Sequence, residues 1–95
     1  MDYQETNTRI IEYLRPFDAE KIGLFGSYAR MEDTSESDID ILVKFKNTLT
    51  LLQLAKINRE LSEILGKKVD LVTESSIKNE RLKEFIYHDL KIIYE

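Results

Sequence analysis

Residues 26–43 read GSYARMEDTSESDIDILV, where a Gly-Ser pair closes one apolar run and two aspartates interrupt the next. From Asp38 to Phe45, apolar and polar residues alternate with a period of two, which predicts a strand with two different faces. One face would hold Ile39, Ile41, Val43 and Phe45. The other face would hold Asp38, Asp40, Leu42 and Lys44, so both aspartates are expected outside the core.

The segments on either side of this stretch alternate between helix and strand patterns. Helices are predicted over about 3–14, 27–31 and 48–65, and from a cap at Ser75 or Ser76 to about His88. Strands are predicted over 21–26 (KIGLFG), 38–45, 68–72 (KVDLV) and the closing LKIIYE segment. Alternating helices and strands favour helices layered on a sheet, so we expect a single α/β domain over residues 1–95.

The helix predicted over 48–65 has the clearest amphipathic pattern in the chain. Thr48 or Thr50 can cap its start, and Gly66 stands where a helix-ending glycine belongs. Its expected core stripe is Leu51, Leu54, Asn58, Leu61 and Leu65, with Leu52, Ala55 and Ile64 beside it. The apolar positions of the last helix are Ile77, Leu82, Phe85 and Ile86, with Leu90 just beyond it, and Phe85 is expected in the core or at an interface. We expect the long stripe to be core and not a groove for a partner.

Composition excludes several classes of function. Fourteen basic and 18 acidic residues give a net charge of −4, and no long Lys/Arg run is present, which argues against general nucleic-acid binding. With no cysteine and one histidine, disulfides, thiol chemistry and a structural zinc site are excluded. Because no apolar run approaches a membrane span or a signal peptide, we expect a cytoplasmic protein.

Three aspartates stand out as candidate metal ligands. Asp38 and Asp40 are two positions apart on one strand face, about 6–7 Å along the strand. Asp70 in KVDLV has the same setting between apolar neighbours, so the three carboxylates converge if the two strands are adjacent. Like charges about 4 Å apart repel by about 4 kcal/mol at an effective dielectric near 20, which favours a bound cation or proton. Hard divalent cations such as Mg²⁺ prefer such oxygen ligands.

A simpler interpretation of a lone D-x-D pair is the solvated face of an edge strand, and short motifs alone often have no function. A calcium loop of the EF-hand type does not fit, because Ile41 and Val43 stand among the positions that would need oxygen ligands.

The Gly26-Ser27 pair adds a second feature. Ser27 is expected to cap the following helix, and Gly26 would let a phosphate approach the backbone closely. An ordinary strand-to-helix turn with a serine cap is the alternative, and neither a P-loop nor a dinucleotide fingerprint is present.

Together, Gly26-Ser27, ten intervening residues and Asp38-Ile39-Asp40 form the pattern G-S-x10-D-x-D, which resembles the polymerase-β-like nucleotidyltransferases. The string GSYAR…SDIDILV is similar to the smallest members, the MNT-type minimal nucleotidyltransferases. The third acid in KVDLV and the closing helix and strand also match, so the resemblance covers nearly the whole chain. Met31 departs from the family, which usually has glycine after the arginine. The resemblance implies a palm core with a mixed sheet and helices packed on it.

The resemblance also implies a role for each matching residue. Gly26 and Ser27 would hold the nucleotide phosphates, while Asp38 and Asp40 would bind Mg²⁺, with two ions when nucleotide is present. Asp70 would complete the metal site and help to deprotonate the acceptor hydroxyl. Arg30 would contact a phosphate or pair with Glu32 or Asp33; the sequence leaves both open.

The function implied is Mg²⁺-dependent transfer of AMP from ATP to a hydroxyl. The acceptor implied is a tyrosine of a HEPN-domain toxin, which would make this protein an antitoxin. A non-catalytic antitoxin that acts by binding alone is an alternative, and small-molecule transfer of the aminoglycoside type is another. The sequence leaves oligomeric state open.

Overall fold

A mixed four-stranded sheet with the order β3-β2-β1-β4 is the frame of the molecule, whose computed structural model describes residues 2–95. The strands are β1 (Ala19–Phe25), β2 (Ile39–Phe45), β3 (Val69–Thr73) and β4 (Lys91–Tyr94). β1 is antiparallel to both β2 and β4, whereas β3 is parallel to β2. The two aspartate-bearing strands are therefore adjacent, which is the condition on which the three carboxylates were expected to converge.

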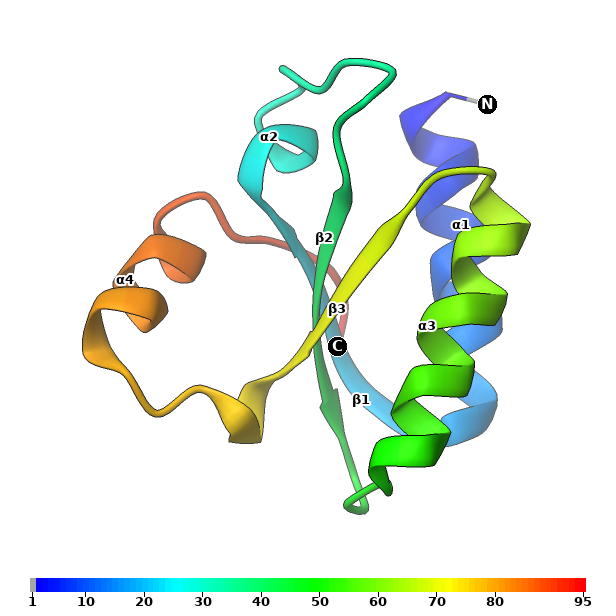
Figure 1. Cartoon of the computed structure of the whole chain (residues 1–95), viewed down its shortest axis with the longest axis vertical. Coiled ribbons are helices and arrows are strands. Elements are labelled where there is room, and N and C mark those ends of the chain that lie inside the picture. The colour runs from blue at the N-terminus through cyan, green and yellow to red at the C-terminus, as the bar shows by residue number, and fades with distance from the viewer. Residues whose placement is uncertain (1) are drawn as a thin grey trace.

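The helices lie on both faces of this sheet. They are α1 (Tyr3–Leu14), α2 (Gly26–Ala29), α3 (Leu51–Leu65) and α4 (Glu80–His88), with short 3₁₀ turns at Arg15–Phe17 and Glu74–Ser76. α1 and α3 pack side by side on one face, α4 lies on the other, and α2 stands at the end where β1 leaves the sheet (Figure 1). The predicted alternation of helices and strands is confirmed; the first helix has the predicted bounds, and other boundaries differ by up to five residues.

Two apolar clusters hold these layers together. The larger joins α1 and α3 to the sheet through buried residues that include Ile10, Leu14, Ile41, Ile57, Leu61 and Val69. The smaller joins α4 to the opposite face through Phe25, Leu42 and Ile86. Leu42 was expected on a polar face, but it is 1% exposed because α4 covers that half of the strand. The acidic face of β2 is thus limited to its beginning.

The first turn of α3 does not belong to the core, contrary to the expected stripe. Leu51 and Leu52 are 86% and 85% exposed, whereas Ile57, Leu61 and Leu65 are buried. The helix begins at Leu51 because Thr50 and Gln53 form a reciprocal capping box. This turn lies at the end of the molecule where the chain leaves β2 (Figure 1), so only the later turns meet the sheet. Gly66 ends the helix with a left-handed backbone, as predicted.

The last helix also starts later than the sequence predicts. Asn79 is its cap, accepting hydrogen bonds from the backbone of Arg81 and Leu82, while Ser76 lies in the preceding 3₁₀ turn. In α4 only Ile86 is buried, and Leu82 and Phe85 are 47% and 61% exposed. No helix within residues 2–95 has the length and apolar character needed to cross a bilayer.

Candidate functional site

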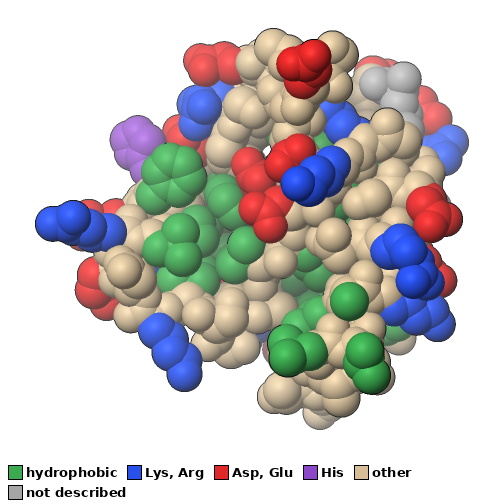
Figure 2. Space-filling model, viewed as in Figure 1, with side chains coloured by type: hydrophobic (Ala, Val, Ile, Leu, Met, Phe, Trp, Pro, Cys, Tyr) green, Lys and Arg blue, Asp and Glu red, His purple; other side chains and the backbone are tan. Residues whose placement is uncertain are grey.

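The candidate site lies where β2 and β3 begin. Asp40 and Asp70 are paired in the parallel register, so their side chains leave the same face of adjacent strands about 4.8 Å apart. Asp38 precedes Ile39, the first residue of β2. Figure 2 shows acidic side chains gathered over these strands, with apolar side chains next to them on the side where α4 lies. The structure therefore brings the three predicted aspartates to one region.

Polar side chains of α3 hold the strand that carries Asp70. β3 is an edge strand, and its outward backbone N–H groups would otherwise lack partners. Val69 N donates to Ser62 Oγ at 3.0 Å, and Leu71 N donates to Asn58 Oδ1 at 3.1 Å. The residues on both sides of Asp70 are thus fixed to a helix. This explains why Asn58 interrupts the apolar stripe of α3.

Gly26 lies directly against the Asp40 carboxylate. Phe25 pairs with Asp40 across the β1–β2 ladder, which brings the following glycine beside that side chain. The glycine has φ of +74°, and a Cβ built on it would lie 2.2 Å from Asp40 Oδ2. Only glycine fits here, because any side chain would meet the carboxylate in a strained backbone conformation. The Gly-Ser turn and the D-x-D strand therefore lie against each other.

The expected role of Ser27 as helix cap is wrong. The cap position is Phe25, and Ser27 is the second residue of the single-turn helix α2. The helix starts earlier because Gly26 itself supplies its first turn, with Arg30 N donating to Gly26 O at 3.3 Å. Ser27 remains half-buried and next to the glycine that contacts Asp40.

The surroundings of Asp40 disfavour its negative charge. Burial, then the charges of Asp70 and Asp38, raise its pKa to about 6, and Arg30 opposes the shift. None of the hydrogen bonds or ion pairs between described side chains neutralises the Asp40 carboxylate.

Within residues 2–95, no three acidic or histidine side chains are gathered closely enough to hold one metal ion as they stand. The oxygen donors nevertheless fit Mg²⁺, since crowded carboxylates without partners gain most from a cation; Asp38, Asp40 and Asp70 would turn toward it.

Arg30 is held by acidic side chains in this structure. Its Nε donates to Glu32 at 3.2 Å and its guanidinium to Asp89 of the α4 C-cap at 2.7 Å. These contacts raise the pKa of Arg30, Asp89 contributing most. Pairing with Asp33, one of the expected alternatives, is not observed, because Asp33 contacts Lys67 and Tyr3. Sequence reasoning did not find Asp89, Lys67 or Ser62 as members of this region; only Asn58, a polar residue in an apolar stripe, carried a signal.

The comparisons with known proteins identify the class of protein that this fold and site define. The family described as "Polymerase beta, Nucleotidyltransferase" matches residues 8–95. The chain belongs to this family and is a nucleotidyltransferase. Among relatives, it is 45% identical over 74 residues to "Putative protein adenylyltransferase MJ1217" of Methanocaldococcus jannaschii, a match that covers 78% of this chain and 76% of the relative.

Two solved structures are similar over nearly all of the chain. A toxin–antitoxin crystal structure with AMP-PNP superposes with a TM-score of 0.83 at 30% identity, covering 93% of this chain and 72% of the other. A tri-AMPylated Shewanella oneidensis HEPN toxin in complex with MNT antitoxin gives a TM-score of 0.78 at 29% identity, covering 96% and 71%. The expected relation to MNT-type minimal nucleotidyltransferases, and the palm-like mixed fold, are confirmed.

Proposed function

We propose that this protein transfers AMP from ATP to a tyrosine hydroxyl of a HEPN-domain toxin and thereby acts as an antitoxin. The observation that carries the proposal is the contact between Gly26 and Asp40, with Asp70 in register on the next strand. A phosphate-type turn and paired carboxylates at one point are what phosphoryl chemistry requires. The AMPylated toxin bound to a similar antitoxin supports the choice of acceptor.

The reaction forms one bond and breaks another at the α-phosphorus. The acceptor oxygen attacks this phosphorus in line, the bond to the oxygen bridging toward the β-phosphorus breaks, and pyrophosphate leaves. Gly26 and Ser27 would hold the leaving phosphates against the start of α2. Asp70 would accept the proton of the attacking hydroxyl, because it is exposed on the face from which an acceptor can approach. Positioning and charge stabilisation would supply most of the rate.

The residues Asp38, Asp40 and Asp70 would hold Mg²⁺. When bound, Mg²⁺ would polarise the phosphate oxygens and neutralise charge that develops in the transition state. Among these three, Asp40 would gain most from the cation, because burial and then the charges of Asp70 and Asp38 raise its pKa and disfavour its negative charge. Arg30 would contact a phosphate only after releasing Glu32 or Asp89, which makes its contribution dependent on nucleotide.

The test uses ATP labelled at the α-phosphorus, Mg²⁺ and the HEPN-domain partner. Wild-type protein should transfer label to the partner, and substitution of the partner's acceptor tyrosine should abolish it. Asp40→Asn should lose transfer by at least about 100-fold, as expected for loss of a metal ligand.

The matched control is Asp18→Asn. Asp18 is exposed and has φ of +62°, a conformation that asparagine tolerates equally. It precedes β1 and pairs through its carbonyl with Lys46, beyond the opposite end of β2 from Asp40. This variant should keep full transfer. Tight complex formation without label, together with full toxin neutralisation by Asp40→Asn, would contradict the proposal and support the non-catalytic antitoxin.

A further inference from the structure

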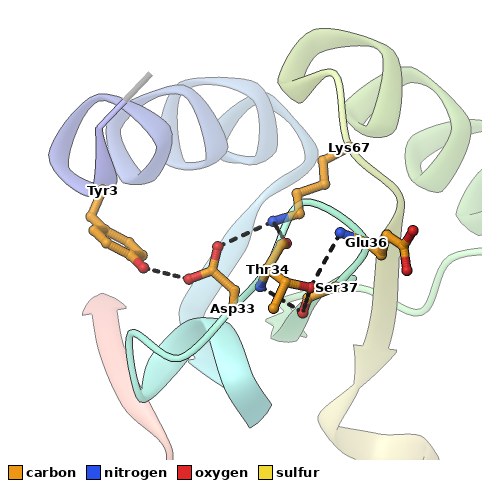
Figure 3. Close-up of polar contacts among 6 residues, drawn as sticks. All are labelled: Tyr3, Asp33, Thr34, Glu36, Ser37 and Lys67. Carbon is orange, nitrogen blue, oxygen red and sulfur yellow. Dashed lines mark hydrogen bonds and ion pairs between the residues drawn. The ribbon is translucent and has the colours of Figure 1, made fainter.

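A polar cluster outside the three aspartates joins three segments that are distant in sequence. Lys67 Nζ lies 3.1 Å from Asp33 Oδ2 and 2.9 Å from the carbonyl oxygen of Thr34. The Tyr3 hydroxyl donates to the other carboxylate oxygen of Asp33. Figure 3 shows Asp33 between Tyr3 of α1 and Lys67, with Thr34 beside it. We call these four residues the Lys67–Asp33 clamp.

The clamp is shielded from solvent more than an ordinary surface ion pair. The side chains of Lys67 and Asp33 are 21% and 14% exposed, whereas those of the pair Arg9 and Glu5 on α1 are 47% and 51% exposed. Salt therefore screens the attraction between Lys67 and Asp33 less than that between Arg9 and Glu5. The Tyr3 hydrogen bond, and then Lys67, lower the pKa of Asp33, so its charge is kept at neutral pH.

On one side, the clamp fixes the loop that leads into Asp38. Thr34 and Ser37 close this loop with two bonds: Thr34 N donates to Ser37 Oγ at 2.9 Å, and Ser37 N donates to Thr34 O at 3.1 Å. Glu36 N also donates to Thr34 Oγ1 at 3.3 Å (Figure 3). Because Ser37 directly precedes Asp38, holding Thr34 also holds the backbone from which Asp38 projects.

On the other side, the clamp fixes the turn that leads into Asp70. Gly66 has φ of +65°, and Lys67 N donates to Ser62 O at 3.2 Å. The end of α3 therefore fixes the position of the Lys67 backbone. Two residues before Asp70, Lys68 accepts a hydrogen bond from Ile39 N at 2.9 Å. The two segments that carry the acids are thus cross-linked by one backbone bond and by Lys67.

We infer that Lys67, through Asp33 and Thr34, is a positioning residue that sets the separation of the Asp38 and Asp70 backbones and hence the affinity of the acidic site for divalent cations. This inference rests on the proposed function, because it assigns the three aspartates as cation ligands. Lys67 contacts none of them, so it acts only through the loop and the turn. Partners that hydrogen-bond metal ligands directly change metal affinity by about 10- to 100-fold when removed, and Lys67 lies one step further out, so we expect an effect at the lower end of that range.

The test measures Mn²⁺ binding, as a spectroscopic substitute for Mg²⁺, to the full chain with AMP-PNP by electron paramagnetic resonance. Lys67→Met keeps the apolar stem but removes the ammonium group, and it should weaken Mn²⁺ binding about 10-fold. Lys67→Arg can donate to the same two oxygens and should restore most of the affinity. Arg9→Met removes an exposed pair on α1 and should leave Mn²⁺ binding unchanged.

Circular dichroism identifies variants that fail to fold. If Lys67→Met does not fold, Asp33→Asn serves in its place, since it keeps an acceptor but loses the charge and should weaken Mn²⁺ binding in the same direction. Unchanged affinity within twofold in a folded variant would overturn the inference while leaving the proposed function intact. If wild type and Asp40→Asn bind Mn²⁺ equally, the metal site of the proposed function fails and the inference fails with it.

Discussion

A Cβ added to Gly26 would lie 2.2 Å from Oδ2 of Asp40, so the glycine and the carboxylate occupy adjoining space at one point of the structure. Asp40 is paired with Phe25 on one neighbouring strand and with Asp70 on the other. The Gly-Ser turn therefore cannot be altered without moving an acid of the site. Because residue 26 has no side chain, the turn can adopt its positive φ and the Asp40 carboxylate can occupy the space beside it. A substitution at Gly26 would therefore affect both the stability of the fold and the proposed activity.

The first prediction compares Gly26→Ala with Gly66→Ala. Both glycines have positive φ, +74° and +65°, so each alanine should cost about 1–2 kcal/mol from backbone strain. A Cβ at Gly66 meets nothing within 4 Å, so Gly66→Ala should keep AMP transfer. Gly26→Ala should be the less stable variant and lose transfer at least about 10-fold, because it displaces Asp40. Thermal denaturation and label transfer measure both, and equal behaviour of the two variants would contradict the contact.

The fold could be predicted from the sequence because its signals are local. The two-residue period of Asp38–Phe45 and the glycine after Leu65 each determine structure within a few residues. The start of α3 could not be predicted in the same way. Leu51 and Leu61 are the same residue type at helical spacing, and only the extent of the sheet decides which one is buried.

The second prediction concerns stability against pH without metal. The pKa of Asp40 rises from its ordinary 3.8 to about 6, so the folded protein holds a proton that the unfolded chain has released between these values. Asp40 therefore destabilises the fold increasingly as pH rises from 4 to 6. Asp40→Asn should raise the free energy of unfolding by about 1–2 kcal/mol at pH 8, after allowance for solvent screening, and by little at pH 4.

Asp33→Asn is the control, because its effect on the free energy of unfolding should have the opposite sign to that of Asp40→Asn. The lowered pKa of Asp33 means that its stabilisation is present above the ordinary value of 3.8 and is lost as pH falls through the folded value. This variant should therefore lose stability at pH 8 and approach wild type as the pH falls further and further below 3.8. Chemical denaturation at each pH checks both curves. A stabilisation by Asp40→Asn that is independent of pH would exclude the buried and repelled charge of Asp40 as its cause.

The third prediction tests how α3 holds the edge strand. Asn58→Leu removes the acceptor of the Leu71 backbone N–H and should cost about 1–3 kcal/mol, because that group loses its partner. Hydrogen exchange at the Leu71 amide should become faster, and label transfer should fall, since Asp70 is the preceding residue. Asn58→Asp keeps an acceptor oxygen and should retain protection of that amide. Unchanged exchange at Leu71 in Asn58→Leu would show that the bond does not hold the strand.

The site was less accessible to sequence reasoning than the fold, because its support comes from residues distant in the chain. Lys67 and Asp33 are 34 residues apart, and no periodic pattern connects them. Arg30 is paired with Asp89, 59 residues further on, and not with its near neighbour Asp33. The acids themselves could be found because each interrupts a strand pattern. Lys67 and Asp33, which we infer to position them, stand in a turn and a loop, where a lysine or an aspartate is ordinary.

The last prediction separates the true core of α3 from the stripe that hydropathy suggests. Leu61 is fully buried, so Leu61→Ala should cost about 2–5 kcal/mol of unfolding free energy. Leu51 and Leu52 are more than 80% exposed, so Leu51→Ser and Leu52→Ser should each change stability by less than about 0.5 kcal/mol. Urea denaturation of the isolated chain measures all three. A loss above about 1 kcal/mol from either serine variant would place the first turn in contact with the core, because an exposed side chain has little burial energy to lose.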